Sequence, residues 1–454
     1  MGAPPEVPSI SLTSSAPPAG TGGYPTAQAS SRARYGARHA EHDYLHPEDP
    51  VGHSSSSSSS SGYHSSVNAA TVPESGGSNE EPAHHEISTL LDSFLGHARE
   101  FGFFLNIQRF HATAYLQLPL GHHARPAAAL LSTAYLIGAA TSRSNSLRAR
   151  ERVFLMDALR RVEEAPTSRH PQSVLHGLQA QVLLANYFFQ NGRFLEGRRH
   201  AAAAFGMAMS LGLHRSQPVS SFVNPEFSSL IGNDLGASID SESEREHVNA
   251  FWASYCINNY WTAALGSPIT PGAHTVIDQA DIRWPTELPH EQTAVAPAPS
   301  SSSAFTIRRF LDGFGSNQQG ATSPVALVAK ASILFERSAW TAGQYRSGQH
   351  NRQALDHAFS LLDGLIENLK THIVSVDQAL QSSTPPLPIV VLTHTLAHAA
   401  MIQLHSPFTA ANAPSHGKSL TAAEFIVYIA NHDAVRALGY VDPIIAVRDC
   451  FLSL

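Results

Sequence analysis

The chain has 454 residues, of which 43% are hydrophobic and only 14% are charged, against roughly 25% charged in ordinary proteins. With 29 basic and 36 acidic residues its formal net charge is −7, so the chain as a whole offers no positive surface for nucleic acid. Two cysteines, Cys256 and Cys450, exclude a disulfide framework and indicate a reducing compartment. The apolar stretch from Ala127 to Ala140 is too short for a membrane span of about 20 residues, so we expect no membrane association.

The first part of the chain, residues 1 to 84, is rich in serine, proline and glycine and includes an uninterrupted serine run from Ser54 to Ser61. A segment with so few apolar clusters cannot bury enough surface to offset its ordering entropy. It is therefore predicted to be a disordered arm. Arg32, Arg34 and Arg38 form a small basic cluster that fits part of a nuclear import signal, although a solvated linker explains the same pattern.

The folded region is predicted to begin near Ile87, where Ile87, Leu90, Leu91 and Phe94 recur at helical spacing. Gly102, among phenylalanines, ends this helix. Further helices are predicted after Pro126, in the segment AAALLSTAYLIGAA, and from about Leu147 to Val162.

A helical hairpin is predicted over the segment Leu183 to Arg215. Its two apolar helices are separated by Asn191-Gly192, a dipeptide that readily adopts positive φ and so turns the chain. Gly212 provides a C-cap. The second helix carries a stripe of small or apolar residues that lets a neighbouring helix approach closely: Gly197, Ala201, Ala204, Ala208 and Leu211.

The rest of the chain is also predicted to be helical. Glu244 to Ala264 is an apolar helix whose aromatic residues Trp252, Tyr255 and Trp261 are interpreted as core, with a ligand cage as the alternative. It is followed by an extended DIRWP segment and by a low-complexity insert at about 286–303. Helices then follow at Pro324 to about Tyr345, Asn351 to about Val374, around His394, and Thr421 to about Leu438. No segment alternates like a strand, so the fold class is predicted to be all-α, an array of helical hairpins.

Three histidines, His394, His398 and His405, share one face of a predicted helix. The first two, at i and i+4, have the spacing of zinc ligands. His405, however, lies two turns further on, roughly 10 Å along the axis, and the glutamate of an H-E-x-x-H enzyme is missing. We interpret them as core residues. The chain also lacks a P-loop, a G-x-G-x-x-G and a G-x-S-x-G motif. No catalytic, cofactor-binding or metal-ligating residue is therefore predicted, and no enzymatic activity.

Four strings carry a resemblance to a known family. They are FQNGRFLEGRRHAAAAFGMAMSLGLHR (Phe189 to Arg215), EREHVNAFWASYCINNYWTAALGSP (Glu244 to Pro268), DIRWP (Asp281 to Pro285) and HTLAHAAMIQLHSPF (His394 to Phe408). In this order they resemble the middle homology region of fungal zinc-cluster transcription factors, especially the basidiomycete type, over roughly Ile87 to Ile445. The resemblance implies that residues 85–454 form an all-α regulatory domain. It also implies control of RNA polymerase II transcription in the nucleus, with protein partners such as the transcription machinery or a second subunit.

The sequence departs from that family at the feature that reads DNA. Two cysteines cannot form its six-cysteine zinc cluster, so no zinc is expected in this chain. We expect DNA contact only through a cluster that was lost or is encoded upstream. The short stretch after GYVDPII (Gly439 to Ile445) suggests a truncated end that would leave apolar helix faces uncovered. Two alternatives remain: a cluster-less partner that modulates a complete factor, and an enzyme with a histidine-bound metal.

Overall fold

The computed structural model describes residues 81–215, 241–266, 273–286, 305–314, 321–348, 352–382, 385–438 and 442–445. In these ranges the secondary structure is helical, and the only extended pairing is an isolated parallel bridge between Arg215 and Asp281. The predicted all-α class is confirmed. Residues 1–80 of the predicted arm and residues 287–303 of the predicted insert lie outside the described residues. Glu81, near the end of the predicted arm, pairs with buried Arg125 at 2.7 Å.

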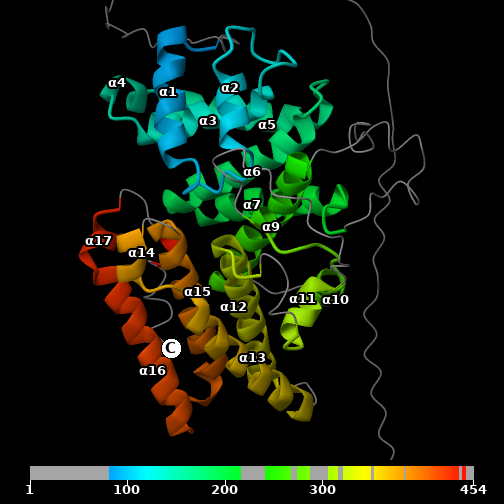
Figure 1. Cartoon of the computed structure of the whole chain (residues 1–454), viewed down its shortest axis with the longest axis vertical. Coiled ribbons are helices and arrows are strands. Elements are labelled where there is room, and N and C mark those ends of the chain that lie inside the picture. Colours follow the sequence, from blue (N-terminus) through cyan, green and yellow to red (C-terminus); the bar gives the residue numbers. More distant parts are fainter. Residues whose placement is uncertain are drawn as a thin grey trace, which may run out of the picture. The chain divides into compact units, whose positions relative to one another are not determined.

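The N-terminal helices are organised around α3. They are α1 (His84–His97), α2 (Ile107–Ala114), α3 (Ala128–Thr141), α4 (Asn145–Ala149), α5 (Glu151–Glu164) and the 3-10 turn η1 (Ala165–Thr167). Helix α3 is buried along almost its whole length and packs against α1, α5 and α6 (Figure 1). Its composition of alanine, leucine and small polar residues explains this position, because such a helix has no polar face to present to water.

The predicted hairpin is formed by α6 (Ser173–Gln190) and α7 (Phe194–Ser210). Gly192 has a φ of 68° at the turn, and Gly212 has the same φ where the second helix ends. Four members of the predicted stripe are buried, while Leu211 is only half-buried. Gly197 permits the closest approach, because a Cβ atom there would lie 2.6 Å from the ring of Phe189. The local prediction of a tightly packed hairpin is confirmed.

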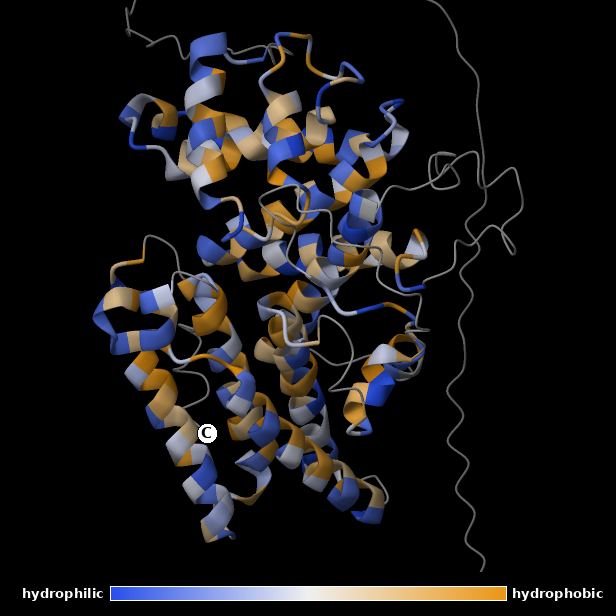
Figure 2. Ribbon diagram, viewed as in Figure 1, coloured by the Kyte–Doolittle hydropathy of each residue, from blue (hydrophilic) through white to orange (hydrophobic). Residues whose placement is uncertain are grey.

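The remaining helices continue the array. They are α9 (Ser241–Ala264), α10 (Ala273–Asp278), α11 (Thr306–Leu311), α12 (Pro324–Ser347), α13 (Arg352–His372), α14 (Val376–Ser382), α15 (Leu387–His405), η4 (Ser406–Phe408), α16 (Ala413–Asn431), α17 (Asp433–Arg436) and η5 (Pro443–Ile445). Helix α9 packs on the α6–α7 hairpin and on α12, and α12 packs on α15, which also contacts α13 and α16 (Figure 1). In Figure 2 much of α3 and α12 is coloured as hydrophobic, in keeping with their central positions.

The predicted helix limits differ from the observed ones mainly near the C-terminus. The helix expected from Thr421 to Leu438 begins earlier, at Ala413, and ends at Asn431, because Asn412 caps its start by accepting a hydrogen bond from the Ser415 amide at 3.2 Å. Helix α2, which the periodicity did not predict, begins with the same device. Its Asn106 side chain accepts from the Arg109 amide at 2.8 Å.

One described helix is long and apolar enough to cross a membrane, a possibility that the sequence analysis overlooked. It covers Leu387–Phe408, but 72% of its apolar 18-residue stretch is buried inside the protein. A core helix of a folded domain has the same composition. The neighbours of α15 within the array account for its hydrophobicity without a membrane.

Candidate functional site

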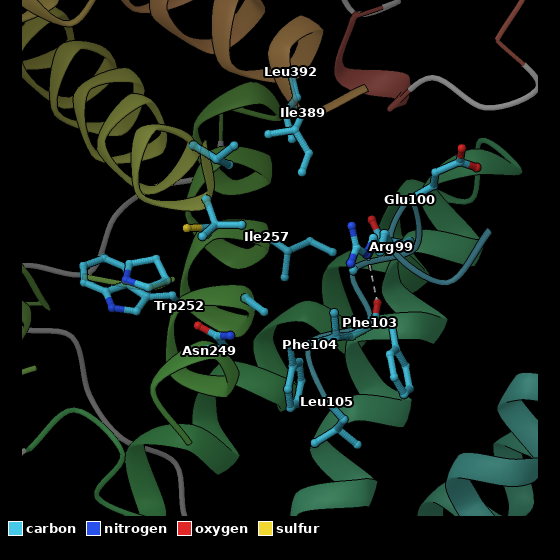
Figure 3. Close-up of a pocket in the computed structure, with 18 of the residues that line it drawn as sticks. Arg99, Glu100, Phe103, Phe104, Leu105, Asn249, Trp252, Ile257, Ile389 and Leu392 are labelled. Carbon is cyan, nitrogen blue, oxygen red and sulfur yellow. Dashed lines mark hydrogen bonds between the residues drawn. The ribbon is translucent and has the colours of Figure 1, made fainter. Parts of the chain in front are cut away.

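A cavity of about 260 Å³ lies where the N-terminal and C-terminal helices meet. Segments that are far apart in the sequence form its walls. Its lining begins with residues 99–100 and 102–106 between α1 and α2 and with residues 107–108 at the start of α2. The rest comes from α6, from α9, from residues 285–286, from the starts of α12 and α15, and from Asp442. Figure 3 shows Ile389 and Leu392 projecting from α15 toward Ile257 of α9, with the segment that contains Phe104 beyond.

Helix α9 provides one complete wall of the cavity. Its lining residues recur at the spacing of one helix face: Asn249, Trp252, Ala253, Cys256, Ile257 and Tyr260. Trp252 is held in place, because its Nε1 donates to the Arg283 carbonyl at 2.8 Å and its ring stacks on Trp284 at 5.0 Å. Trp261 instead stacks on Phe189 at 4.0 Å, away from the cavity lining. Of the three aromatic residues singled out in this helix, only Trp252 borders the cavity, and the core interpretation is confirmed for the other two.

The opposite wall is an irregular segment that buried amide side chains hold in place. The Phe104 amide donates to Gln179 Oε1 at 2.7 Å, and Gln179 Nε2 donates to the Gly102 carbonyl at 3.1 Å. Asn186 Nδ2 donates to the Phe101 carbonyl at 2.9 Å. Buried backbone groups outside a helix need such partners. The sequence analysis missed Gln179 and Asn186, although two amides inside an apolar helix were a readable signal.

A third wall comes from α12 and α15, through Val325, Val328, Ile389 and Leu392. These apolar side chains are only half-buried although they lie between packed helices. Arg99 and Gln108, which also line the cavity, are exposed. Most of the remaining lining residues are apolar.

Two polar residues that line the cavity are held by hydrogen bonds. Asn249 Nδ2 donates to the Thr286 carbonyl at 3.1 Å, which fixes the amide orientation, and its buried Oδ1 has no hydrogen-bond partner among the described residues. Asp442 accepts from the Tyr260 hydroxyl and from the Ile444 amide, both at 3.0 Å. Burial raises the pKa of Asp442 to about 6, so the group is largely ionised at neutral pH.

Among the lining residues, Cys256 carries a thiol, which is a strong nucleophile when it is ionised. Burial raises the pKa of its thiol to about 12, so the reactive thiolate is scarcely populated at neutral pH. Its backbone carbonyl accepts from the Ser332 hydroxyl at 3.3 Å, a contact that joins α9 to α12. The arrangement suits binding of a small molecule better than nucleophilic chemistry.

Of the histidines that share one face of α15, His394 and His398 both lie against the ring of Phe425, whereas His405 has other partners. His394 Nε2 donates to the Val374 carbonyl at 3.0 Å, and the ring of His398 stacks on Phe425 at 4.2 Å. His405 lies 3.1 Å from Asp363 and 3.0 Å from the Ser415 hydroxyl. All three are buried, which confirms their interpretation as core residues. Within the described ranges no group of three or more His, Cys, Asp or Glu residues is arranged to hold a metal ion.

Comparison of the chain with known proteins gave no match. No family model, no curated protein and no solved structure matches it. Its function therefore has to be inferred from its own residues and from the cavity that they form.

Proposed function

We propose that this chain is a transcription regulator. In this proposal it is the regulatory domain of a fungal zinc-cluster-type factor that controls RNA polymerase II transcription in the nucleus, without the DNA-binding cluster in the chain itself. It acts through protein partners and is not an enzyme. The observation that carries the proposal is that three of the strings resembling this family, although distant in sequence, contact one another directly. Two of them, Glu244 to Pro268 and Asp281 to Pro285, also line the cavity.

The contacts between these strings support the proposal. Phe189, at the start of the first string, stacks on Trp261 of the second at 4.0 Å. Trp252 of the second string stacks on Trp284 of DIRWP at 5.0 Å. The Asp281 amide of DIRWP donates to the carbonyl of His214 in the first string at 2.9 Å. The fourth string lies in α15, which packs on α12, and α12 packs on α9. The resemblance thus falls on residues that contact one another, as expected if a family fold underlies it.

A cavity between helices is the feature that a regulatory domain needs. A molecule bound there contacts several helices at once and so favours the arrangement in which the cavity is formed. Such a domain can pass a chemical signal to its partners without catalysing a reaction.

The proposal predicts an effect on transcription that depends on the folded domain. When the chain is fused to an unrelated sequence-specific DNA-binding domain in a fungal cell, we expect a reporter to change several-fold relative to that DNA-binding domain alone. A matched fusion carrying Gly138→Ala, whose added methyl group would overlap the backbone of α1, should show a weaker effect. An expressed, folded and nuclear fusion that leaves the reporter unchanged would refute the proposal.

The unfused chain is not expected to recognise a DNA sequence. Specific binding needs clustered Lys and Arg on a positioned element, and here the formal net charge is −7. Purified protein should show no sequence-specific binding at physiological salt, and any weak retention of DNA should vanish between about 50 and 200 mM salt. Tight, salt-resistant binding of one sequence would contradict this prediction.

A second candidate is a cluster-less protein that binds a complete factor and modulates it. On α5 the apolar side chains Val153 and Met156 are 62% and 61% exposed and lie one turn apart, an arrangement that fits contact with another protein. Co-purification with a cluster-bearing protein, lost in a Val153→Glu/Met156→Glu variant, would favour this candidate.

A further inference from the structure

We propose that the segment around α4 and the first two turns of α5 form a docking surface for an acidic, amphipathic helix of another protein. This α4–α5 surface consists of five exposed residues: Arg143, Arg148, Arg152, Val153 and Met156. The binding itself rests only on these residues. Its consequence, the recruitment of a protein that changes transcription, rests on the proposed function.

Basic residues are concentrated in one part of the chain. The whole chain has a formal net charge of −7, but residues 141–215 contain eleven arginines, no lysine and five acidic residues, and therefore carry a net charge of +6. Four of these arginines lie between positions 143 and 152. This part of the molecule favours a negatively charged partner, because opposite charges steer and stabilise association.

The arginines of the α4–α5 surface are not neutralised by their neighbours. Arg150, which lies among them, is already paired with Glu86 at 2.7 Å. Glu151 is the one acidic residue between positions 143 and 152, and it accepts from the Tyr187 hydroxyl at 2.6 Å. The three arginines of the surface form no ion pair in the part of the chain that the structure describes. Their guanidinium groups are therefore available to the carboxylates of a partner.

The stability of the fold does not explain why arginines gather here. Arg152 lies in the first turn of α5, and Arg148 lies at the end of α4 just before it. The N-terminus of a helix carries a partial positive charge, so it favours acidic residues and disfavours cations. Carboxylates from a partner would be stabilised both by the arginines and by the dipole of α5.

Two apolar side chains lie next to these arginines. Val153 and Met156 are 62% and 61% exposed, and residues three positions apart are neighbours on the surface of a helix. Apolar side chains of a partner would remove both from water, and the flexible methionine can adapt to their shape. A helix with apolar residues one turn apart and carboxylates on either side matches this arrangement.

The apolar pair and the far end of α5 favour a protein over other anionic partners. A nucleic acid would engage the arginines through its phosphates and leave Val153 and Met156 in water. A flat anionic membrane laid along α5 would also meet Glu163 and Glu164, which are exposed near the end of this helix. A short helix bound at the first two turns avoids both disadvantages.

The test uses the purified full chain and three fluorescein-labelled helical peptides of about 18 residues. The first has leucines along one face and glutamates on either side of them. The second has lysines in place of the glutamates, and the third has alanines in place of the leucines. We expect saturable one-to-one binding of the first peptide, measured by fluorescence anisotropy, with an affinity at least about tenfold higher than that of either control peptide.

Substitution of the arginines tests the electrostatic part of the surface. Arg148→Gln/Arg152→Gln should lower the affinity for the acidic peptide about tenfold and should reduce its dependence on salt between about 50 and 200 mM. Arg308→Gln/Arg309→Gln is the matched control, because these two arginines are also exposed but belong to α11. The control variant should bind like the wild type.

Substitution of the apolar pair tests the other part. Val153→Gln/Met156→Gln should lower the affinity about tenfold while keeping its dependence on salt. Leu420→Gln/Tyr428→Gln on α16, where the two side chains are 50% and 52% exposed, is the matched control and should bind like the wild type. All these side chains are exposed, so the melting temperature of each variant should stay close to that of the wild type.

The docking proposal is overturned if the wild-type chain does not bind the acidic peptide, if the lysine peptide binds equally well, or if the arginine variant keeps full affinity. Vesicles containing phosphatidylserine and a mixed-sequence DNA duplex are tested in parallel. Retention of either at about 150 mM salt, lost in the arginine variant and kept in the apolar one, would assign the surface to phosphates and reject a protein partner. Self-association that Val153→Gln/Met156→Gln abolishes would assign it to a second copy and reject the proposal too.

These failures are separate from those of the proposed function. An active tethered reporter with no peptide binding rejects only the docking surface. Saturable peptide binding with a silent reporter supports the docking surface and rejects the regulator.

Discussion

The protein is expected to lose its fold as the pH falls from about 6 to about 4, because several histidines are buried in their neutral form. Burial lowers the pKa of His176 and of His398 to about 3 and that of His200 to about 4. His176 accepts a hydrogen bond from the Ala127 amide at 3.0 Å, and His200 stacks on Phe188 at 5.1 Å. The cation of His170 further disfavours a protonated His176, and at His200 the cation of Arg199 outweighs the carboxylate of Glu196.

The direction of this pH effect follows from the histidine pKa values in the folded and unfolded states. A histidine in the unfolded chain titrates near pH 6.5. Above that pH the neutral ring does not oppose folding. As the pH falls from 6.5 toward the lower pKa of the folded state, the unfolded chain binds the proton first, and the free energy of unfolding decreases. Each histidine adds a slope of about 1.4 kcal/mol per pH unit. Asp442, whose pKa is raised to about 6, acts in the opposite direction below pH 6 and offsets about one histidine. The net slope is about 3 kcal/mol per pH unit, large against a total stability of about 5–15 kcal/mol.

Urea unfolding at a series of pH values measures this slope directly. His398→Leu should reduce the slope by about one histidine's share, since a leucine in place of the ring has no charge to acquire at Phe425. His416→Leu is the matched control, because His416 is exposed on α16. A free energy of unfolding that does not change between pH 7 and pH 5 would show that these histidines are not buried as described.

Local features of the fold were predictable from sequence because their physical causes are local. A glycine that can adopt positive φ marks the hairpin turn at Gly192, and small residues at helical spacing mark the close contact made by Gly197. The short helix α2 was missed although its Asn106 cap is a readable signal. Spacing also put His394 and His405 on one helix face correctly, but it could not reveal that Val374 and Asp363, from other elements, would be their separate partners.

The cavity could not be predicted, because no single segment contains it. One wall depends on hydrogen bonds between Gln179 and the backbone of Gly102 and Phe104, more than seventy residues earlier in the chain. The partly buried ion pair of Arg337 with Asp278, at 2.5 Å, likewise joins α12 to α10 through two residues that are 59 positions apart. Pattern analysis finds residues that are apolar and periodic, but it does not reveal which polar ones meet across the fold.

Gly138→Ala is expected to destabilise the protein by about 3 kcal/mol or more, although the same change in an ordinary helix is stabilising by about 1 kcal/mol. Gly138 lies in α3 where the helix crosses α1. A Cβ atom there would overlap the Leu90 carbonyl oxygen and would lie 2.7 Å from its carbonyl carbon and 3.0 Å from its Cα. These are backbone atoms within a helix, so the overlap is relieved only if α1 moves away from α3.

Movement of α1 would uncover a large apolar face. Leu90, Leu91 and Phe94 are fully buried on α1 and belong to the main core. The loss of their packing is why the cost should reach or exceed the upper end of the usual range for overpacking, about 1–3 kcal/mol. The measurement is the free energy of unfolding in urea at pH 7.5, far from the histidine transition.

Gly343→Ala provides the matched control for this prediction. Gly343 is also inside a helix, α12, but it is exposed and a Cβ atom there would meet nothing within 4 Å. That variant should gain up to about 1 kcal/mol, because alanine restricts the unfolded chain and favours the helix. The two substitutions are chemically identical, so an opposite sign isolates the contact between α1 and α3. If Gly138→Ala were as stable as Gly343→Ala, α1 could not lie against α3 as closely as described.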